Sequence, residues 1–158
     1  MKRFVAFAAA VSMLFVLTGC NSLSLWLTER DEQALEKLYQ EISQTAQSAE
    51  SFEITDESGN VLLTQEDLEH VEMMWQSNGD DTYPIVLLTF DRDGAEKFKN
   101  ATADNMGREL KILLDDEEVF SAVVNAVIGD GQAVLSGEKI ATQEQAMELA
   151  VRIESTME

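Results

Sequence analysis

The residue best suited to chemistry in this 158-residue chain is its single cysteine, Cys20. A cysteine thiolate is a strong nucleophile, and this one directly follows Leu17-Thr18-Gly19. Upstream lie a basic start, Lys2-Arg3, and an apolar stretch from Phe4 to Leu17 that is broken only by Ser12. This layout is typical of a secretory signal peptide and is too short and wrongly flanked for a membrane-spanning helix.

The residues around Cys20 resemble the lipobox of bacterial lipoproteins, where small residues precede a cysteine. The resemblance implies a signal peptide over 1–19, cleavage between Gly19 and Cys20, and a diacylglyceryl group with palmitate-type chains on the Cys20 thiol. Residues 20–27 would then form a lipidated tether. The alternative is an ordinary secretion signal with a chance cysteine. We therefore expect an exported protein, anchored by lipid to the extracytoplasmic face of the cell membrane.

No other residues form a pattern typical of a catalytic or metal site. His70 is the only histidine and has no serine or cysteine in a nucleophile context, so we expect it at the surface or at a strand edge. Asp91-Arg92-Asp93-Gly94 lacks the further acidic ligands of a calcium loop and is interpreted as a turn before a helix. The acidic turns at 80–81 and 115–118 fit either weak calcium binding or simple solvation. We expect no enzyme, no cofactor, no metal and no small-molecule substrate.

Charge restricts the classes of partner. Without residues 1–20, 138 residues remain, enough for one domain with a core. Removing Lys2 and Arg3 leaves 9 basic residues against 30 acidic ones, a net charge of −21 with His70 neutral. Phosphate backbones and anionic lipid headgroups repel such a chain, which argues against nucleic-acid binding. The charge favours solubility and standoff from the membrane, or attraction of basic partner segments or divalent cations. A single cysteine also excludes an intramolecular disulfide.

Hydrophobic periodicity predicts the elements that position these residues. Thr28-Glu29-Arg30-Asp31 is a capping box, and apolar residues at helical spacing follow it, so we expect an amphipathic helix over 28–50. The rest of the chain, 51–158, contains shorter helical and strand patterns separated by turns. Helices are expected after the capping boxes at 64–67 and 142–145 and over 94–107, and strands over 71–75, 85–90, 112–114, 119–128 and 133–136. This order predicts an α+β domain with a mainly antiparallel sheet and helices packed on one face.

The stretch from Gly94 to Asp115 resembles the head subdomain of the first extracytoplasmic domain of SecD/SecDF, a membrane-embedded component of protein export. The similarity extends over about residues 61–153, including Leu63 to Leu68. The family pattern is carried, at matching spacing, by Gly94, Phe98, Thr102, Asn105, Gly107, Leu110, Asp115 and Gly137.

Several of these positions have structural roles on physical grounds alone. Phe98 is expected to anchor its helix on the sheet. Gly107 follows the helix, where a positive φ helps to satisfy the last carbonyls. Asn105 and Thr102 are expected to bond nearby helix backbone.

The chain also departs from the family pattern. Val123 replaces a proline, and about two residues are inserted around 138–140. No later apolar stretch is long enough to span a membrane, so the resemblance implies the substrate-contacting head and not a proton-driven motor.

We therefore expect a lipid-anchored binding module that contacts exported polypeptides or the export machinery, with strand addition at a free sheet edge as the mode of binding. The alternative is a regulatory or structural envelope lipoprotein. It would bind one specific protein partner through the helix over 28–49.

Overall fold

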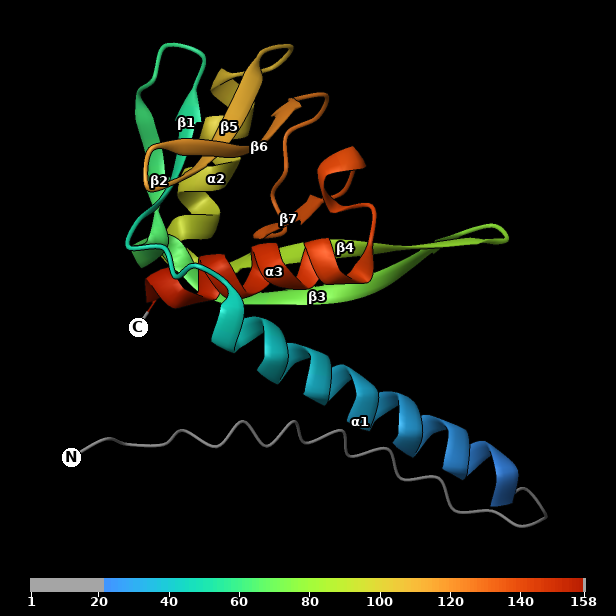
Figure 1. Ribbon diagram of the computed structural model, residues 1–158. Coiled ribbons are helices and arrows are strands. Elements are labelled where there is room, and N and C mark those ends of the chain that lie inside the picture. The colour runs from blue at the N-terminus through green and yellow to red at the C-terminus, as the bar shows by residue number, and fades with distance from the viewer. Residues whose placement is uncertain (1–21, 158) are drawn as a thin grey trace. The chain divides into compact units, whose positions relative to one another are not determined.

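The computed structural model describes residues 22–157 (Figure 1). The chain divides into two units between Ala34 and Leu35. The first helix, α1 (Ser22–Thr45), begins in one unit and ends in the other, and it starts before the capping box expected to open it. Three leucines between Ser22 and Thr28 favour helix, which accounts for the earlier start. No helix among residues 22–157 is long and apolar enough to cross a membrane.

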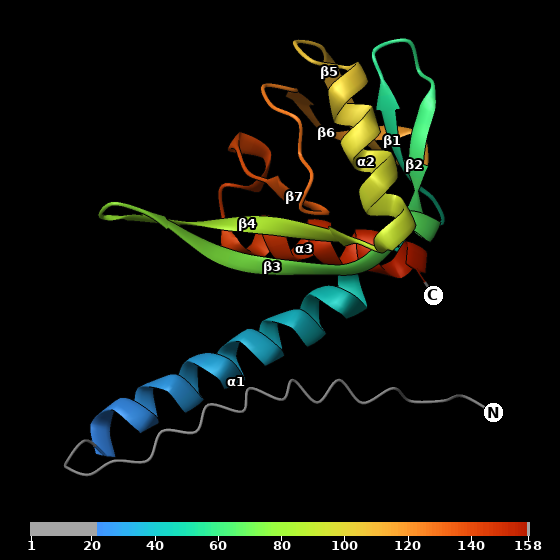
Figure 2. The same ribbon diagram turned by 180° about the vertical axis from the view of Figure 1, so that it is seen from behind.

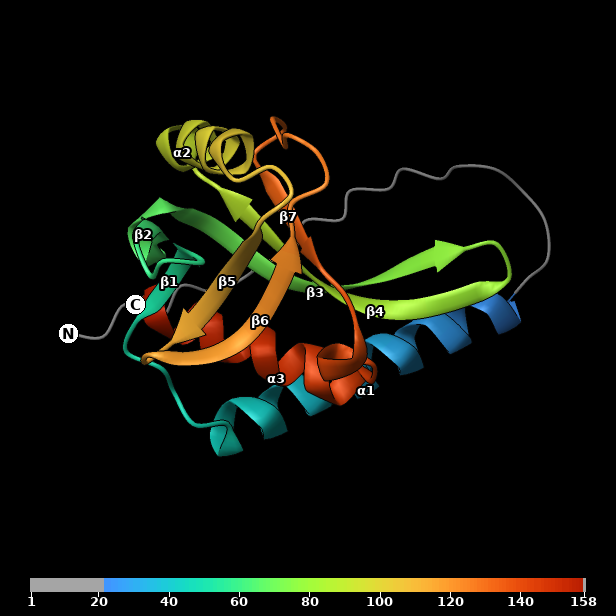
Figure 3. The same cartoon turned by 90° about the horizontal axis from the view of Figure 1, so that it is seen from above.

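Two antiparallel sheets make up the second unit, where the sequence predicted one. A four-stranded sheet has the order β2-β1-β5-β6, and a three-stranded sheet has the order β3-β4-β7 (Figures 1 and 3). The strands are β1 (Phe52–Asp56), β2 (Val61–Thr64), β3 (Leu68–Asn78), β4 (Asp81–Phe90), β5 (Glu109–Leu114), β6 (Glu117–Val123) and β7 (Gln132–Leu135). With the helices described below, this arrangement confirms the α+β class.

Two helices complete the second unit, α2 (Arg92–Asp104) and α3 (Gln143–Glu154). The third capping box is confirmed, since the Gln145 backbone N–H donates to Thr142 Oγ1 at 3.2 Å. Helix α3 lies along β3 and β4, and α2 packs against β2 and the end of β4 (Figure 2). Short 3-10 helices are Gln65–Asp67, Glu138–Ile140 and Ser155–Met157.

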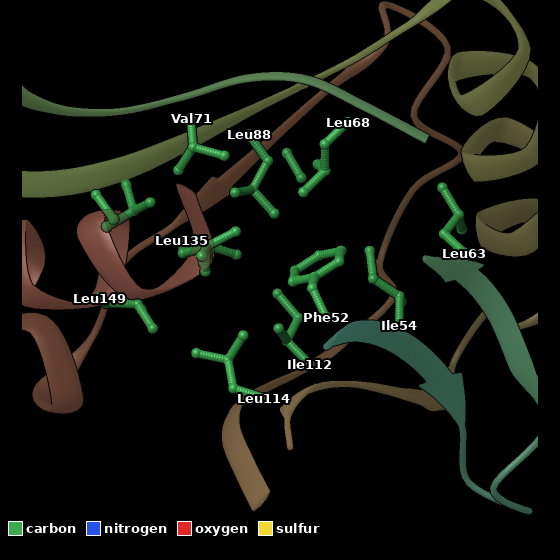
Figure 4. Packing of buried hydrophobic residues seen from close by; sticks show 14 of the residues in the cluster. Phe52, Ile54, Leu63, Leu68, Val71, Leu88, Ile112, Leu114, Leu135 and Leu149 are labelled. Carbon is green, nitrogen blue, oxygen red and sulfur yellow. The ribbon is translucent and has the colours of Figure 1, made fainter. Parts of the chain in front are cut away.

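Both sheets and both helices contribute to one apolar core. Phe52 of β1 is fully buried among residues of the two sheets and of α3 (Figure 4). At the end of β4, the ring of Phe90 packs against that of Phe98, with centroids 4.6 Å apart, and this contact fixes α2 on β4. Each sheet therefore buries its apolar face against the other.

The end of α1 is tied to α3 within the second unit. Tyr39 Oη donates to Glu154 Oε2 at 2.7 Å, and the Ala49 backbone N–H donates to Ser155 Oγ at 3.0 Å. Partial burial, together with this carboxylate, raises the pKa of Tyr39 to about 12.

This raised pKa predicts a loss of stability at high pH. The Tyr39 phenol titrates near 10 in the unfolded chain but near 12 when folded, so the free energy of unfolding falls as pH rises from 10 to 12. We expect a loss of about 1 kcal/mol after allowing for solvent screening. Denaturant titrations of the full chain and of Tyr39→Phe at pH 9 and pH 12 measure it. The variant should lose less stability over this interval, and equal losses would contradict the assignment.

The turn between β5 and β6 contains two non-glycine residues in the left-handed region, Asp115 (φ 50°) and Asp116 (φ 66°). The Asp115 carboxylate accepts the Glu50 backbone N–H at 2.8 Å and that of Ser51 at 3.0 Å. These bonds lower the pKa of Asp115 and explain its conformation. No hydrogen bond is found for the Asp116 side chain within residues 22–157, so its backbone strain is not offset there.

We therefore expect Asp116→Gly to stabilise the protein. Relief of the left-handed conformation should raise the free energy of unfolding by about 1 kcal/mol. Asp116→Ala removes the same charge while keeping a Cβ and should give no gain. Thermal unfolding of both variants measures the effect, and equal stabilisation by both would show that charge, not φ, is responsible.

Candidate functional site

The most distinctive hollow in the second unit is an apolar groove of about 340 Å³ between the two sheets. Its floor contains core residues of β5, α2 and β7, including Leu110, Phe98 and Leu135. Its wall is made by Phe120, Ala122 and Val123 of β6 and by residues of the segment that follows. None of the fifteen residues that line it is charged, in a chain of which 26% is charged.

The rim of this groove exposes apolar side chains to solvent. Val123 and Val134, which line the groove, are 53% and 48% exposed, respectively. Exposed apolar surface beside an open hollow typically marks a site where another molecule binds.

Residues 124–131 close one side of the groove and are not the continuation of a strand over 119–128 that the sequence predicted. The strand ends at Val123. Val124 then bonds across to residues 107 and 108, since the Gly107 N–H donates to its carbonyl and its own N–H donates to the Arg108 carbonyl, each at 2.9 Å. Farther on, the Ile128 N–H donates to Thr102 Oγ1 at 3.1 Å. The Val124 bonds continue the β5–β6 pairing by one residue, up to the start of β5, and the bond to Thr102 then holds the following segment beside α2.

Two strands with free edges flank the groove. Strand β6 is the last of its sheet and β7 the last of the other. Each therefore carries unpaired backbone groups along one side, which an extended chain can use as hydrogen-bond partners.

The structure brings three of the predicted family positions together at the groove. Phe98, Thr102 and Leu110 all line it. The role expected for Thr102 is confirmed, since its hydroxyl donates to the Lys99 carbonyl at 3.0 Å while it accepts the bond from Ile128.

The other family positions have structural roles elsewhere. Asn105 ends α2 and donates from Nδ2 to the Ala101 carbonyl at 2.9 Å, and Gly107 has the expected positive φ of 75°. Gly94 lies against Asp67, Asp115 forms the β5–β6 turn, and Gly137 has a φ of 148° before a 3-10 helix. The positions proposed for cleavage and lipidation, Gly19 and Cys20, lie outside the described residues.

Sequence reasoning missed the groove residues of β6, β7 and the connecting segment, such as Phe120, Val123 and Val134. The available signal was composition: eight of the ten residues from Val119 to Ile128 are apolar, too many for an edge strand with one solvated face.

Other hollows and polar groups among the described residues of the second unit form no arrangement typical of a catalytic or metal site. A shallow polar hollow of about 430 Å³ lies beside α2 and contains Lys97, Asp104 and Arg108. His70 Nε2 lies 3.8 Å from a carboxylate oxygen of Glu72 on β3, an edge strand as expected. Asp91 accepts the Gly94 N–H at 2.7 Å as the N-cap of α2, so the predicted helix-entry turn is the first turn of the helix, which begins at Arg92 and not at residue 94. No group of acidic, histidine or cysteine side chains suited to a metal occurs within the described part of the chain.

A family model and individual relatives indicate the same protein family. The model of the SecDF P1 head subdomain matches residues 38–156. The chain is 35% identical over 101 residues to the protein translocase subunit SecD of Acidaminococcus fermentans, covering 64% of this chain and 24% of that protein. It is 36% identical over 97 residues to the protein translocase subunit SecDF of Thermus thermophilus, covering 61% and 12%.

Solved structures agree with these matches. A structure of SecDF, described as a membrane component that enhances protein export, superposes with a TM-score of 0.58 at 25% identity and covers 89% of this chain and 71% of the solved one. The chain spans about a quarter or less of the full-length curated relatives named above.

Proposed function

Because this chain belongs to the family of SecDF P1 head subdomains, we propose that it is a lipid-anchored, extracytoplasmic binding module that contacts exported polypeptides or the export machinery. The observation that carries the proposal is the uncharged groove between the free edges of β6 and β7. Its family supports protein export as the process, since a solved SecDF is a membrane component that enhances export.

The groove suits an extended chain better than a small polar molecule. Backbone groups of such a chain can pair with β6 or β7, while its apolar side chains bury against Phe120, Val123 and Val134. Backbone pairing does not depend on sequence, and an apolar wall discriminates weakly between apolar side chains. A protein that meets many different exported chains needs this kind of recognition.

Photocrosslinking in cells tests the proposal. A photoreactive residue replaces Val134, which is 48% exposed at the groove, or Val61, which is 49% exposed on β2. We expect secreted precursors or translocon subunits to be recovered from position 134 and not from position 61. Recovery of neither class from position 134 would overturn the proposal.

A charge in the groove should abolish this contact. Val134→Asp places a carboxylate where the bound chain would bury it, and we expect crosslinking from position 123 to fall about tenfold or more, since burying an unpaired charge costs several kcal/mol. Val61→Asp adds the same charge at equal exposure and should leave the yield unchanged. Equal losses in both variants would indicate a general effect of charge.

The lipid anchor requires its own test. Cells are fed an alkyne-labelled fatty acid, and the purified full chain is examined for label and for membrane association. Cys20→Ala should lose both. Equal labelling of that variant would contradict lipidation at Cys20.

The second candidate function, binding of one envelope partner through α1, is favoured by the exposure of Leu35, which is 38% exposed on that helix. Deleting the helix is a poor test, because Ile42 is buried in the second unit and Tyr39 is bonded to Glu154. Leu35→Asp is the cleaner variant. Loss of one specific partner with groove crosslinking intact would favour this function.

A further inference from the structure

The outer half of the β3–β4 hairpin lacks the third strand that pairs with its inner half. Strand β3 is the first of its sheet, so its outer edge is free. Strand β7 pairs with β4 only from Val86 to Thr89, which leaves the residues of β4 before Val86 without a partner on that side. Figures 1 and 3 show the two strands running on past α3 and β7. We call this segment, residues 74–85, the arm.

The arm exposes two large apolar side chains. Trp75 is 50% exposed and Met74 is 41% exposed. As neighbours in a strand they lie on opposite faces, and Pro84 and Ile85 are their cross-strand partners. Tryptophan is among the residues that contribute most to binding energy in interfaces, and methionine adapts to varied partners.

The arm is also held in a defined conformation. Tyr83 Oη donates to Gln76 Oε1 at 3.1 Å, and the hydroxyls of Ser77 and Thr82 lie 3.3 Å apart across the strands. A preformed two-stranded edge costs a partner less ordering entropy than a flexible loop does.

The charges within the arm have one sign, and the sequence on both sides of it is acidic. Between Lys37 and Arg92 the sequence contains twelve acidic residues and no Lys or Arg. Asp80 and Asp81 stand at the tip, and both are exposed. Within the described part of the chain, neither of them is in an ion pair, so their charges add to the field around Trp75 rather than being neutralised by a neighbour.

This charge decides between the occupants that an apolar edge could accept. A second copy of this chain, with a net charge of −19, would bring like charges together. An anionic membrane surface would be repelled for the same reason. A cationic segment is attracted, and its Lys or Arg groups can also contact the face of Trp75. We infer that the arm is a docking surface for an extended, basic segment of a partner protein, which adds to the free edge of β3.

This inference is independent of the groove. The groove is uncharged and selects segments with apolar side chains, whereas the arm selects segments with positively charged side chains. A variant that disables one surface therefore leaves the other in place, and each can fail alone.

A peptide titration tests the inference. A labelled peptide of alternating lysine and valine is titrated into the full chain in detergent micelles, with fluorescence anisotropy as the measurement. We expect saturable binding that weakens as salt is added. A peptide of alternating glutamate and valine should not bind. In a Trp26→Phe background, where Trp75 is the only tryptophan, binding should also shift its emission.

Matched variants locate the binding. Trp75→Ala and the double variant Asp80→Lys/Asp81→Lys should each weaken binding of the lysine peptide about tenfold. Glu96→Lys/Glu148→Lys makes the same charge change at exposed positions of α2 and α3 and should weaken it much less. Val134→Asp in the groove should have no effect. Equal binding of the glutamate peptide, unchanged binding to the arm variants, or equal losses from both double variants would each overturn the inference, as would a shift of Trp75 emission by anionic vesicles.

Discussion

Gly94→Ala is expected to lower the free energy of unfolding by about 3 kcal/mol, because the first turn of α2 touches the backbone of Asp67. A Cβ built on Gly94 overlaps the carbonyl oxygen of Asp67 and lies 2.9 Å from its Cβ. Backbone atoms cannot swing aside as the end of a flexible side chain can.

Asp67 is also held from three directions. Its carbonyl accepts the Asp91 N–H at 3.0 Å, its carboxylate accepts the Thr64 N–H at 3.0 Å, and Lys97 Nζ lies 2.6 Å from the other carboxylate oxygen. The carboxylate is buried, so a shift that breaks these bonds leaves polar groups unsatisfied. The structure therefore has no inexpensive way to accommodate the added methyl group.

Gly129→Ala is the matched control. A Cβ there meets only the end of the Lys99 side chain, at 3.8 Å, and Gly129 does not have a positive φ. We expect a change within about 0.5 kcal/mol for this variant. Chemical denaturation of both variants measures the difference, and a loss below 1 kcal/mol for Gly94→Ala would show that the two segments separate easily.

Phe52→Ala should cost about 4 kcal/mol, the largest effect expected of a single substitution in this chain. Its ring is fully buried between the sheets, near Ile112 and Leu114 (Figure 4). Removing it leaves a cavity where β1, β5 and α3 meet, and the surrounding side chains come from both sheets and cannot all collapse into it. A domain of this size has a total stability of roughly 5–15 kcal/mol, so much of the folded state would be lost.

Two further variants separate cavity formation from other causes. Phe52→Leu keeps most of the apolar volume and should cost less than about 1.5 kcal/mol. Met106→Ala removes an exposed side chain and should have little effect. Thermal unfolding gives the order of stability, and similar losses for Phe52→Ala and Phe52→Leu would contradict a tightly packed site.

Local signals in the sequence were reliable where a few neighbouring residues decide the outcome. The capping box at Thr142, the cap at Asp91 and the positive φ at Gly107 all follow from backbone groups within a turn of the residue concerned. The predicted start of the first helix, at residue 28, was wrong, since α1 begins at Ser22. The helix propensity of the residues before Thr28 outweighs the capping box.

The groove could not be predicted from the sequence, because it depends on contacts between residues that are distant in the sequence. The segment after Val123 is as apolar as a buried strand, but its strand partner β5 begins at Glu109, and the bond from Ile128 to Thr102 places the segment beside α2 instead. Similarly, the chain passes from one sheet to the other at the 3-10 turn between β2 and β3, and Asp67 in this turn bonds to distant Lys97 in α2 as well as to the nearby Thr64. Hydrophobic periodicity indicates which face of a helix or strand is buried, but not which other element packs against that face.

By itself the sequence determined the α+β class, the family and the excess of negative charge, and it contains the N-terminal pattern from which export and lipidation of Cys20 are proposed. These properties are set by composition, local spacing and ordered patterns, which do not require the chain to be folded. Only the tertiary structure decided that Phe98, Thr102 and Leu110 share one uncharged groove with β6 and β7. It also decided that the arm, which contains Trp75, extends past the end of β7. The groove is made by segments far apart in the chain, and the arm, although continuous in sequence, is exposed because no other strand among residues 22–157 extends along it.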